Sequence, residues 1–70
     1  MNQTFTAVVK NDDEWWIGWI EEVPGVNCQG RSRDDLLKTL RITLMEALET
    51  NRADARDAGG KGYEELSIVV

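Results

Sequence analysis

The spacing of apolar side chains changes along the chain from a strand-like to a helix-like pattern. Residues 3–10 are rich in Thr, Val and Phe, and residues 15–20 are denser still in large apolar side chains. Both stretches are typical of β-strands. Residues 11–14 lie between them and have the composition of a turn, so the two strands form a hairpin. Residues 26–29 predict a third, short strand.

A helix is predicted to begin after Ser32 and to run to about Thr50, because apolar side chains recur there on one stripe at about 100° per residue. The stripe consists of Leu36, Leu37, Leu40, Leu44, Ala47 and Leu48. Residues 51–62 are charged and end in glycines, which indicates a fraying helix end and a flexible link. Residues 63–70 alternate again and predict a fourth strand.

The predicted element order is therefore βββαβ, which belongs to the α+β class. We expect a single domain over residues 1–70, in which one helix covers a mostly antiparallel two-layer sheet. A hairpin loop centred on Asp12 and Asp13 would pair Val9 with Trp16, Ala7 with Gly18 and Phe5 with Ile20. That face of the sheet is apolar, and its small central residues would let the helix approach closely.

Four residues predict the turn and the helix start that follow the second strand. Pro24 and Gly25 suit the two central positions of a type II turn, since Gly25 supplies the positive φ that this turn requires. Gly30 ends the third strand. Ser32 is a suitable N-cap, whose side chain would accept a hydrogen bond from the backbone N–H of Asp35.

Composition and charge narrow the class of protein. The 70 residues are 41% hydrophobic and 30% charged, carry a net charge of −5 and include no histidine. This balance is typical of a folded soluble domain. An acidic surface repels phosphate backbones, so we expect no direct nucleic-acid partner, and a basic protein is the more suitable partner. We expect no small-molecule substrate, because the sequence contains no glycine-rich phosphate loop and no set of polar residues typical of a pocket. No stretch predicts a membrane span or a secretory signal, and we expect a cytoplasmic protein.

Candidate catalytic chemistry is sparse. The single Cys28 has no second cysteine or histidine beside it and is interpreted as a small strand residue. A metal-dependent nuclease would need converging carboxylates, and the available ones are Asp12, Asp13, Glu14, Glu21 and Glu22. They fall in a loop and at a strand end, and the first strand holds no acid. We therefore predict no catalytic residue, no metal site and no cofactor.

The chain resembles the HicB antitoxin family, in particular the compact N-terminal domain of that family with its partial ribonuclease-H-like fold. The residues that carry the resemblance are Phe5-Thr6-Ala7-Val8, Trp16-Ile17-Gly18-Trp19, Glu22-Val23-Pro24-Gly25-Val26, Gln29-Gly30 and the helix start at Ser32. Members of the family neutralise HicA, a small basic toxin that cleaves messenger RNA. Longer members add a DNA-binding domain. This sequence contains no such segment, so we expect no operator binding.

The resemblance implies an antitoxin-like protein that binds a HicA-type toxin and occludes its RNA-binding surface. Two alternatives remain open, a solitary HicB-like regulator that forms homodimers or higher oligomers, and a cryptic metal-dependent nuclease. Neighbouring residues of a strand point to opposite faces, so one helix cannot cover all three tryptophans, and a partner subunit or toxin is expected to cover the rest. The predicted partner-binding residues are Trp15, Ile17, Trp19, Glu21, Glu22, Ile42 and Met45.

Overall fold

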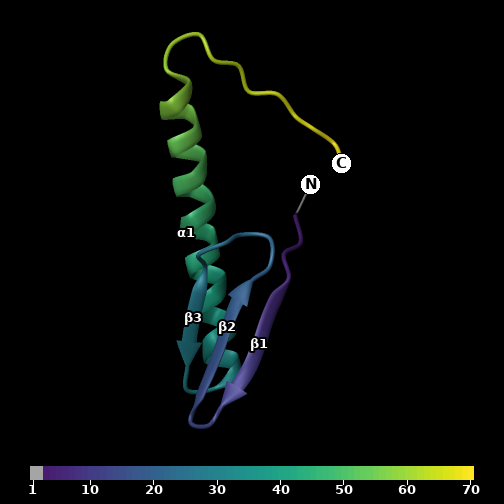
Figure 1. Cartoon of the computed structure of the whole chain (residues 1–70), viewed down its shortest axis with the longest axis vertical. Coiled ribbons are helices and arrows are strands. Elements are labelled where there is room, and N and C mark those ends of the chain that lie inside the picture. Colours follow the sequence, from purple (N-terminus) through teal and green to yellow (C-terminus); the bar gives the residue numbers. More distant parts are fainter. Residues whose placement is uncertain (1–2) are drawn as a thin grey trace.

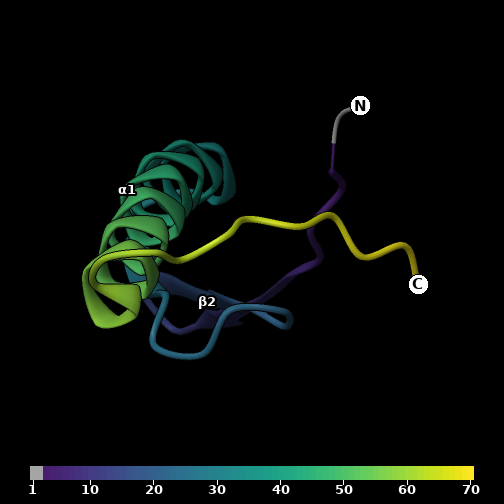
Figure 2. The same cartoon turned by 90° about the horizontal axis from the view of Figure 1, so that it is seen from above.

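The computed structural model describes residues 3–70 and has two layers. Three strands, β1 (Ala7–Asp12), β2 (Trp15–Ile20) and β3 (Asn27–Gly30), form an antiparallel sheet in the order β1-β2-β3. One helix, α1 (Arg33–Gly59), lies behind the sheet (Figure 1). The view from above separates the helical layer from the sheet (Figure 2). The predicted α+β class, with one helix across an antiparallel sheet, is confirmed.

The hairpin between β1 and β2 has the predicted faces but a different register. Val9 pairs with Gly18 and Ala7 with Ile20, a shift of two residues from the prediction. The turn residues are Asp13 and Glu14, and Asp13 takes a φ of +57°, which aspartate adopts more readily than most residues. Because the shift is an even number, each side chain stays on the face that the sequence predicted.

Pairing of the first strand begins later than predicted. The backbone N–H of Glu21 donates to the carbonyl of Thr6 at 3.0 Å, and the β-ladder starts at Ala7 rather than at residue 3. The strand then continues to Asp12, two residues beyond the predicted end. Asn11 therefore lies inside the ladder and pairs with Trp16, because the chain turns only at Asp13.

The core lies between the sheet and the first half of α1. Its buried members are Ile20, Val23, Val26, Leu36 and Leu40. Gly18 lets the two layers meet, since a Cβ at this position would lie 3.1 Å from Leu36 Cδ2 and 2.9 Å from the carbonyl oxygen of Val8. The close approach expected at Gly18 is confirmed. Ala7, which was expected to help, is exposed.

The predicted turn and cap are present. Val26 N–H donates to the Val23 carbonyl at 3.4 Å, and Gly25 has a φ of +91°, as a type II turn with Pro24 before it requires. Asp35 N–H donates to Ser32 Oγ at 3.1 Å, so Ser32 is the N-cap of α1. Together these contacts connect β2 to β3 and β3 to the helix.

The helix is longer than predicted. It continues past Thr50 to Gly59, where Gly60 takes a φ of +63° and its N–H donates to the Asp57 carbonyl at 3.2 Å. We call residues 33–48 the sheet-backed half and residues 49–59 the projecting half. Every residue of the projecting half is exposed. The molecule is consequently elongated, with extents of 51 × 23 × 15 Å.

The predicted fourth strand is wrong. Residues 63–70, called the tail below, form no regular secondary structure and are all exposed. The tail leaves the top of α1 and ends on the side of the molecule where β1 lies (Figure 1). Alternating apolar residues are compatible with a strand, but a strand also needs a hydrogen-bonding neighbour, and the tail lies in no sheet. The described architecture is therefore βββα.

Candidate protein-binding face

The sheet has one face that α1 leaves uncovered, and three of the predicted partner-binding residues lie on it. Inward positions of β2, Gly18 and Ile20, are buried against the helix, so the alternate positions Trp15, Ile17 and Trp19 face outward. Trp19 is 38% exposed, and Trp15 and Ile17 are half-buried. This outer face is the candidate site.

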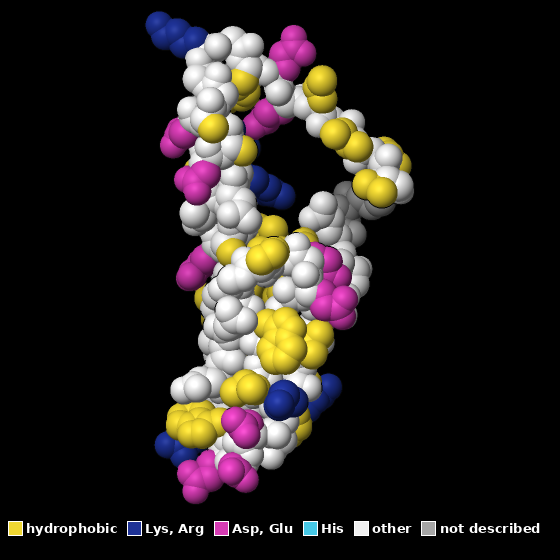
Figure 3. Space-filling view, in the orientation of Figure 1, with side chains coloured by type: hydrophobic (Ala, Val, Ile, Leu, Met, Phe, Trp, Pro, Cys, Tyr) yellow, Lys and Arg dark blue, Asp and Glu magenta, His cyan; other side chains and the backbone are white. Residues whose placement is uncertain are grey.

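Neighbouring strands complete the outer face. Trp19 is paired with Val8 of β1 and Asn27 of β3, and Ile17 is paired with Lys10 and Gln29. A shallow depression between β2 and β3 is lined by Ile17, Trp19, Asn27, Gln29 and the backbone around Gly18 and Cys28. In the space-filling view, hydrophobic side chains form a patch over this face of the sheet (Figure 3). The face is apolar at its centre and polar along its margins.

Trp15 has a neighbour that the sequence interpretation missed. The guanidinium carbon of Arg31 lies 4.3 Å from the centroid of the Trp15 ring, within the range of a cation–π interaction. Register explains the contact, since Gly30 pairs with Trp16 and Arg31 follows it, opposite Trp15. Arg31 partly covers Trp15, so Trp19 is the more accessible aromatic anchor on the outer face.

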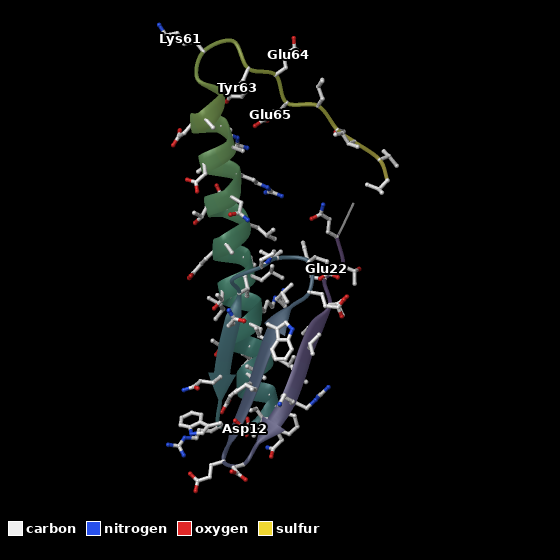
Figure 4. All side chains as sticks on the ribbon, in the orientation of Figure 1. Asp12, Glu22, Lys61, Tyr63, Glu64 and Glu65 are labelled. Carbon is white, nitrogen blue, oxygen red and sulfur yellow. The ribbon has the colours of Figure 1, made fainter. Side chains whose placement is uncertain are left out.

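Carboxylates lie at both ends of the outer face. Asp12 and the turn residues after it are at the hairpin end, and Glu21 and Glu22 follow β2 at the other end. Figure 4 shows Asp12 and Glu22 at these opposite ends of the sheet. The outer face therefore has an apolar centre between two acidic ends.

Glu22 also has a structural contact. The backbone N–H of Thr6 donates to Glu22 Oε1 at 2.7 Å. This hydrogen bond from Thr6 favours the charged carboxylate and holds the pKa of Glu22 below its ordinary value of 4.5. Glu22 therefore fastens the segment before β1 to the turn after β2, whereas the side chain of Glu21 is exposed.

Ile42 and Met45 do not lie on the outer face. Both belong to α1, on the other layer of the molecule, where Ile42 is 59% and Met45 61% exposed. Met45 lines a groove between α1 and the segment before β1, together with Phe5, Leu44 and Leu48. A single flat partner surface cannot contact both layers, so the seven predicted residues divide into two separate groups.

Within residues 3–70, no group of three or more His, Cys, Asp or Glu side chains is arranged to hold a metal ion. Cys28 points inward, where its thiol lies 3.4 Å from Thr43 Oγ1 on α1. Among the same described residues, α1 is too polar to cross a lipid bilayer.

Comparisons of the chain with protein-family models, with curated proteins and with solved structures found no match. The resemblance to HicB antitoxins therefore rests on the sequence motifs given above and stays a prediction.

Proposed function

We propose that this chain is an antitoxin-type protein that binds a small basic mRNA-cleaving toxin of the HicA type through the outer face of its sheet. The observation that carries the proposal is the exposed Trp19, which lies beside Ile17 and Val8 on a face that α1 leaves open. Tryptophan is over-represented among the residues that dominate binding energy, and such residues cluster at the centre of an interface.

Charge supports the same proposal. The net charge of −5 and the carboxylates at both ends of the outer face would attract a basic RNA-binding surface over a long range. The apolar centre would then hold the complex after the encounter. The chain would act by steric occlusion, because RNA and antitoxin would compete for one surface of the toxin. In this mechanism the chain itself catalyses no reaction.

Growth rescue tests this function. Each small basic reading frame beside the gene for this chain is expressed alone and together with the chain. We expect one of them to arrest growth and degrade mRNA, and the wild-type chain to relieve the arrest. The Trp19→Glu variant should fail to relieve it, because a charge is placed at the centre of the apolar face.

Thr50→Glu is the matched control, since it adds the same charge at an exposed position of α1. Urea unfolding of both variants verifies that they fold. The proposal is wrong if no neighbouring reading frame arrests growth, or if Trp19→Glu relieves the arrest as well as the control does.

The exposed aromatic centre of the outer face also favours a second candidate function, a solitary regulator that assembles with itself through this face. Sedimentation of the chain alone separates the two candidates. The solitary regulator would be supported if the chain forms a homodimer that Trp19→Glu dissociates and if no neighbouring reading frame encodes a toxin that the chain neutralises.

A further inference from the structure

The start of the tail already lies against the last turns of α1. Arg56 Nε donates to Glu65 Oε1 at 2.7 Å, in an ion pair. A Cβ at Gly59 would lie 2.8 Å from the Cβ of Tyr63, so this part of the tail is in close contact with the helix. Residues 63–65 thus line a depression together with Arg52, Arg56 and Gly59.

Beyond Glu65 the tail leaves the helix with its apolar side chains in solvent. Leu66 is 79%, Ile68 86% and Val69 95% exposed. Both ribbon views show this segment on the side of the molecule where β1 lies, separated from α1 (Figures 1 and 2). Such a run of exposed apolar residues is costly in water and favours an apolar cover.

A groove continues along α1 from the depression that holds the start of the tail. Its floor and walls are formed by Phe5, Leu44, Met45 and Leu48, with Arg41 and Arg52 beside them. Arg52 lines both the groove and the depression. At about 100° per residue, Arg41, Met45, Leu48, Arg52 and Arg56 fall on one stripe of the helix. The groove is therefore the continuation of the surface on which residues 63–65 lie.

The reach of the tail matches the groove. Residues 66–70 span about 17 Å when extended, at about 3.3 Å per residue. From Arg56, where the ion pair fixes Glu65, Met45 is eleven helical residues away, or about 17 Å at 1.5 Å per residue. An extended segment that starts at Glu65 and follows the stripe would end at Met45.

We propose that residues 66–70 close onto this groove within the same chain, so that Ile68 packs on Leu48 and Val70 packs on Met45 and Phe5. Arg52 and Arg41 can donate hydrogen bonds to the backbone carbonyls of the extended segment. The ion pair between Arg56 and Glu65 holds the start of the tail on α1 while the rest of the tail closes. Met45 then has an intramolecular role in place of the predicted partner contact. The outer face of the sheet stays open, so the closure is independent of the proposed function.

Disulfide trapping tests the closure. Leu48→Cys and Ile68→Cys are combined in a Cys28→Ser background and oxidised at micromolar protein concentration. Closure brings the two sulfurs within bonding geometry, so we expect an intramolecular disulfide in a monomer. The matched control combines Ile68→Cys with Thr50→Cys, which is exposed and lies about 160° around the helix from Leu48. The groove pair should form at least about tenfold faster than the control, because closure raises its effective concentration.

Equal rates for the two pairs would overturn the proposal, and so would disulfides found only between two chains. The unmodified chain gives a second readout that needs no cysteine variant. Methyl NMR should show contacts from Ile68 to Leu48 and from Val70 to Met45. Their absence in the wild-type chain would also contradict the closure.

Discussion

The two halves of α1 have similar backbone structure but very different surroundings. The sheet-backed half contains the two most deeply buried side chains, Leu36 and Leu40, whereas every side chain of the projecting half is exposed. The first half is held by packing against β2 and β3. The second half depends on its own backbone hydrogen bonds and on the helix propensity of Ala, Arg and Glu.

This difference separates two reasons for helix formation. The amphipathic stripe ends at Leu48, because there is no sheet beyond that residue for apolar side chains to cover. The helix itself ends eleven residues later, at Gly59, where glycine interrupts it. The hydrophobic pattern therefore indicates which part of a helix packs against the rest of the protein. Helix propensity and a terminating glycine indicate where the helix ends.

The largest expected effect comes from emptying the core under the sheet-backed half. Leu40→Ala should lower the free energy of unfolding by about 2–5 kcal/mol, since it removes a buried side chain and leaves a cavity. Ile42→Ala, two residues away on the exposed side, should change it by less than about 0.5 kcal/mol. Urea unfolding followed by tryptophan fluorescence measures both. Equal losses of unfolding free energy in the two variants would contradict the assignment of Leu40 to the core and of Ile42 to the surface.

A pair of glycine substitutions sharpens the comparison between the halves. Ala47→Gly, in the sheet-backed half, should lower the free energy of global unfolding by about 1 kcal/mol through helix propensity. Ala53→Gly is the same substitution in the projecting half. It should reduce the helical circular dichroism signal and leave the unfolding midpoint nearly unchanged, because this half can unfold locally. An equal shift of the midpoint in both variants would show that the whole helix unfolds as one unit.

The smallest expected effect concerns pH. Because the pKa of Glu22 is lowered in the folded chain by the Thr6 N–H, its contribution to stability is present above the ordinary pKa of 4.5. That contribution is lost as the pH falls through the lowered value. Glu22→Gln keeps an acceptor oxygen but does not titrate. The wild-type chain should therefore lose slightly more stability than Glu22→Gln between pH 6 and pH 3 in urea titrations, and identical losses would contradict the assignment.

Local signals in the sequence predicted much of this fold. The Pro24-Gly25 turn, the Ser32 cap and the bounds of β2 are as predicted, since each depends on neighbouring residues alone. The hairpin register was missed by two residues, because the choice between Asp12 and Asp13 as the first turn residue depends on a positive φ that composition does not reveal. The fourth strand was wrong because alternation does not specify a pairing partner.

The candidate site was also predicted only in part, because some of its contacts depend on residues that are distant in the sequence. Strand alternation alone places Trp15, Ile17 and Trp19 on one face, and the structure has them there. The cover that Arg31 gives to Trp15 depends on the register of β3, which a single sequence leaves open. Helical periodicity places Ile42 and Met45 on the far side of the helix, and the structure has both exposed there, on the other layer from the outer face.

The most direct test of the central claim is the dissociation rate of the toxin identified by growth rescue. Trp19→Ala should raise the rate about thirtyfold, equivalent to about 2 kcal/mol, since it removes the anchor at the centre of the outer face. Thr50→Ala on the far layer should leave it unchanged. Rising salt should slow association and change dissociation little, because only the long-range attraction is screened. A dissociation rate unaffected by Trp19→Ala would contradict the account and exclude the outer face as the binding surface.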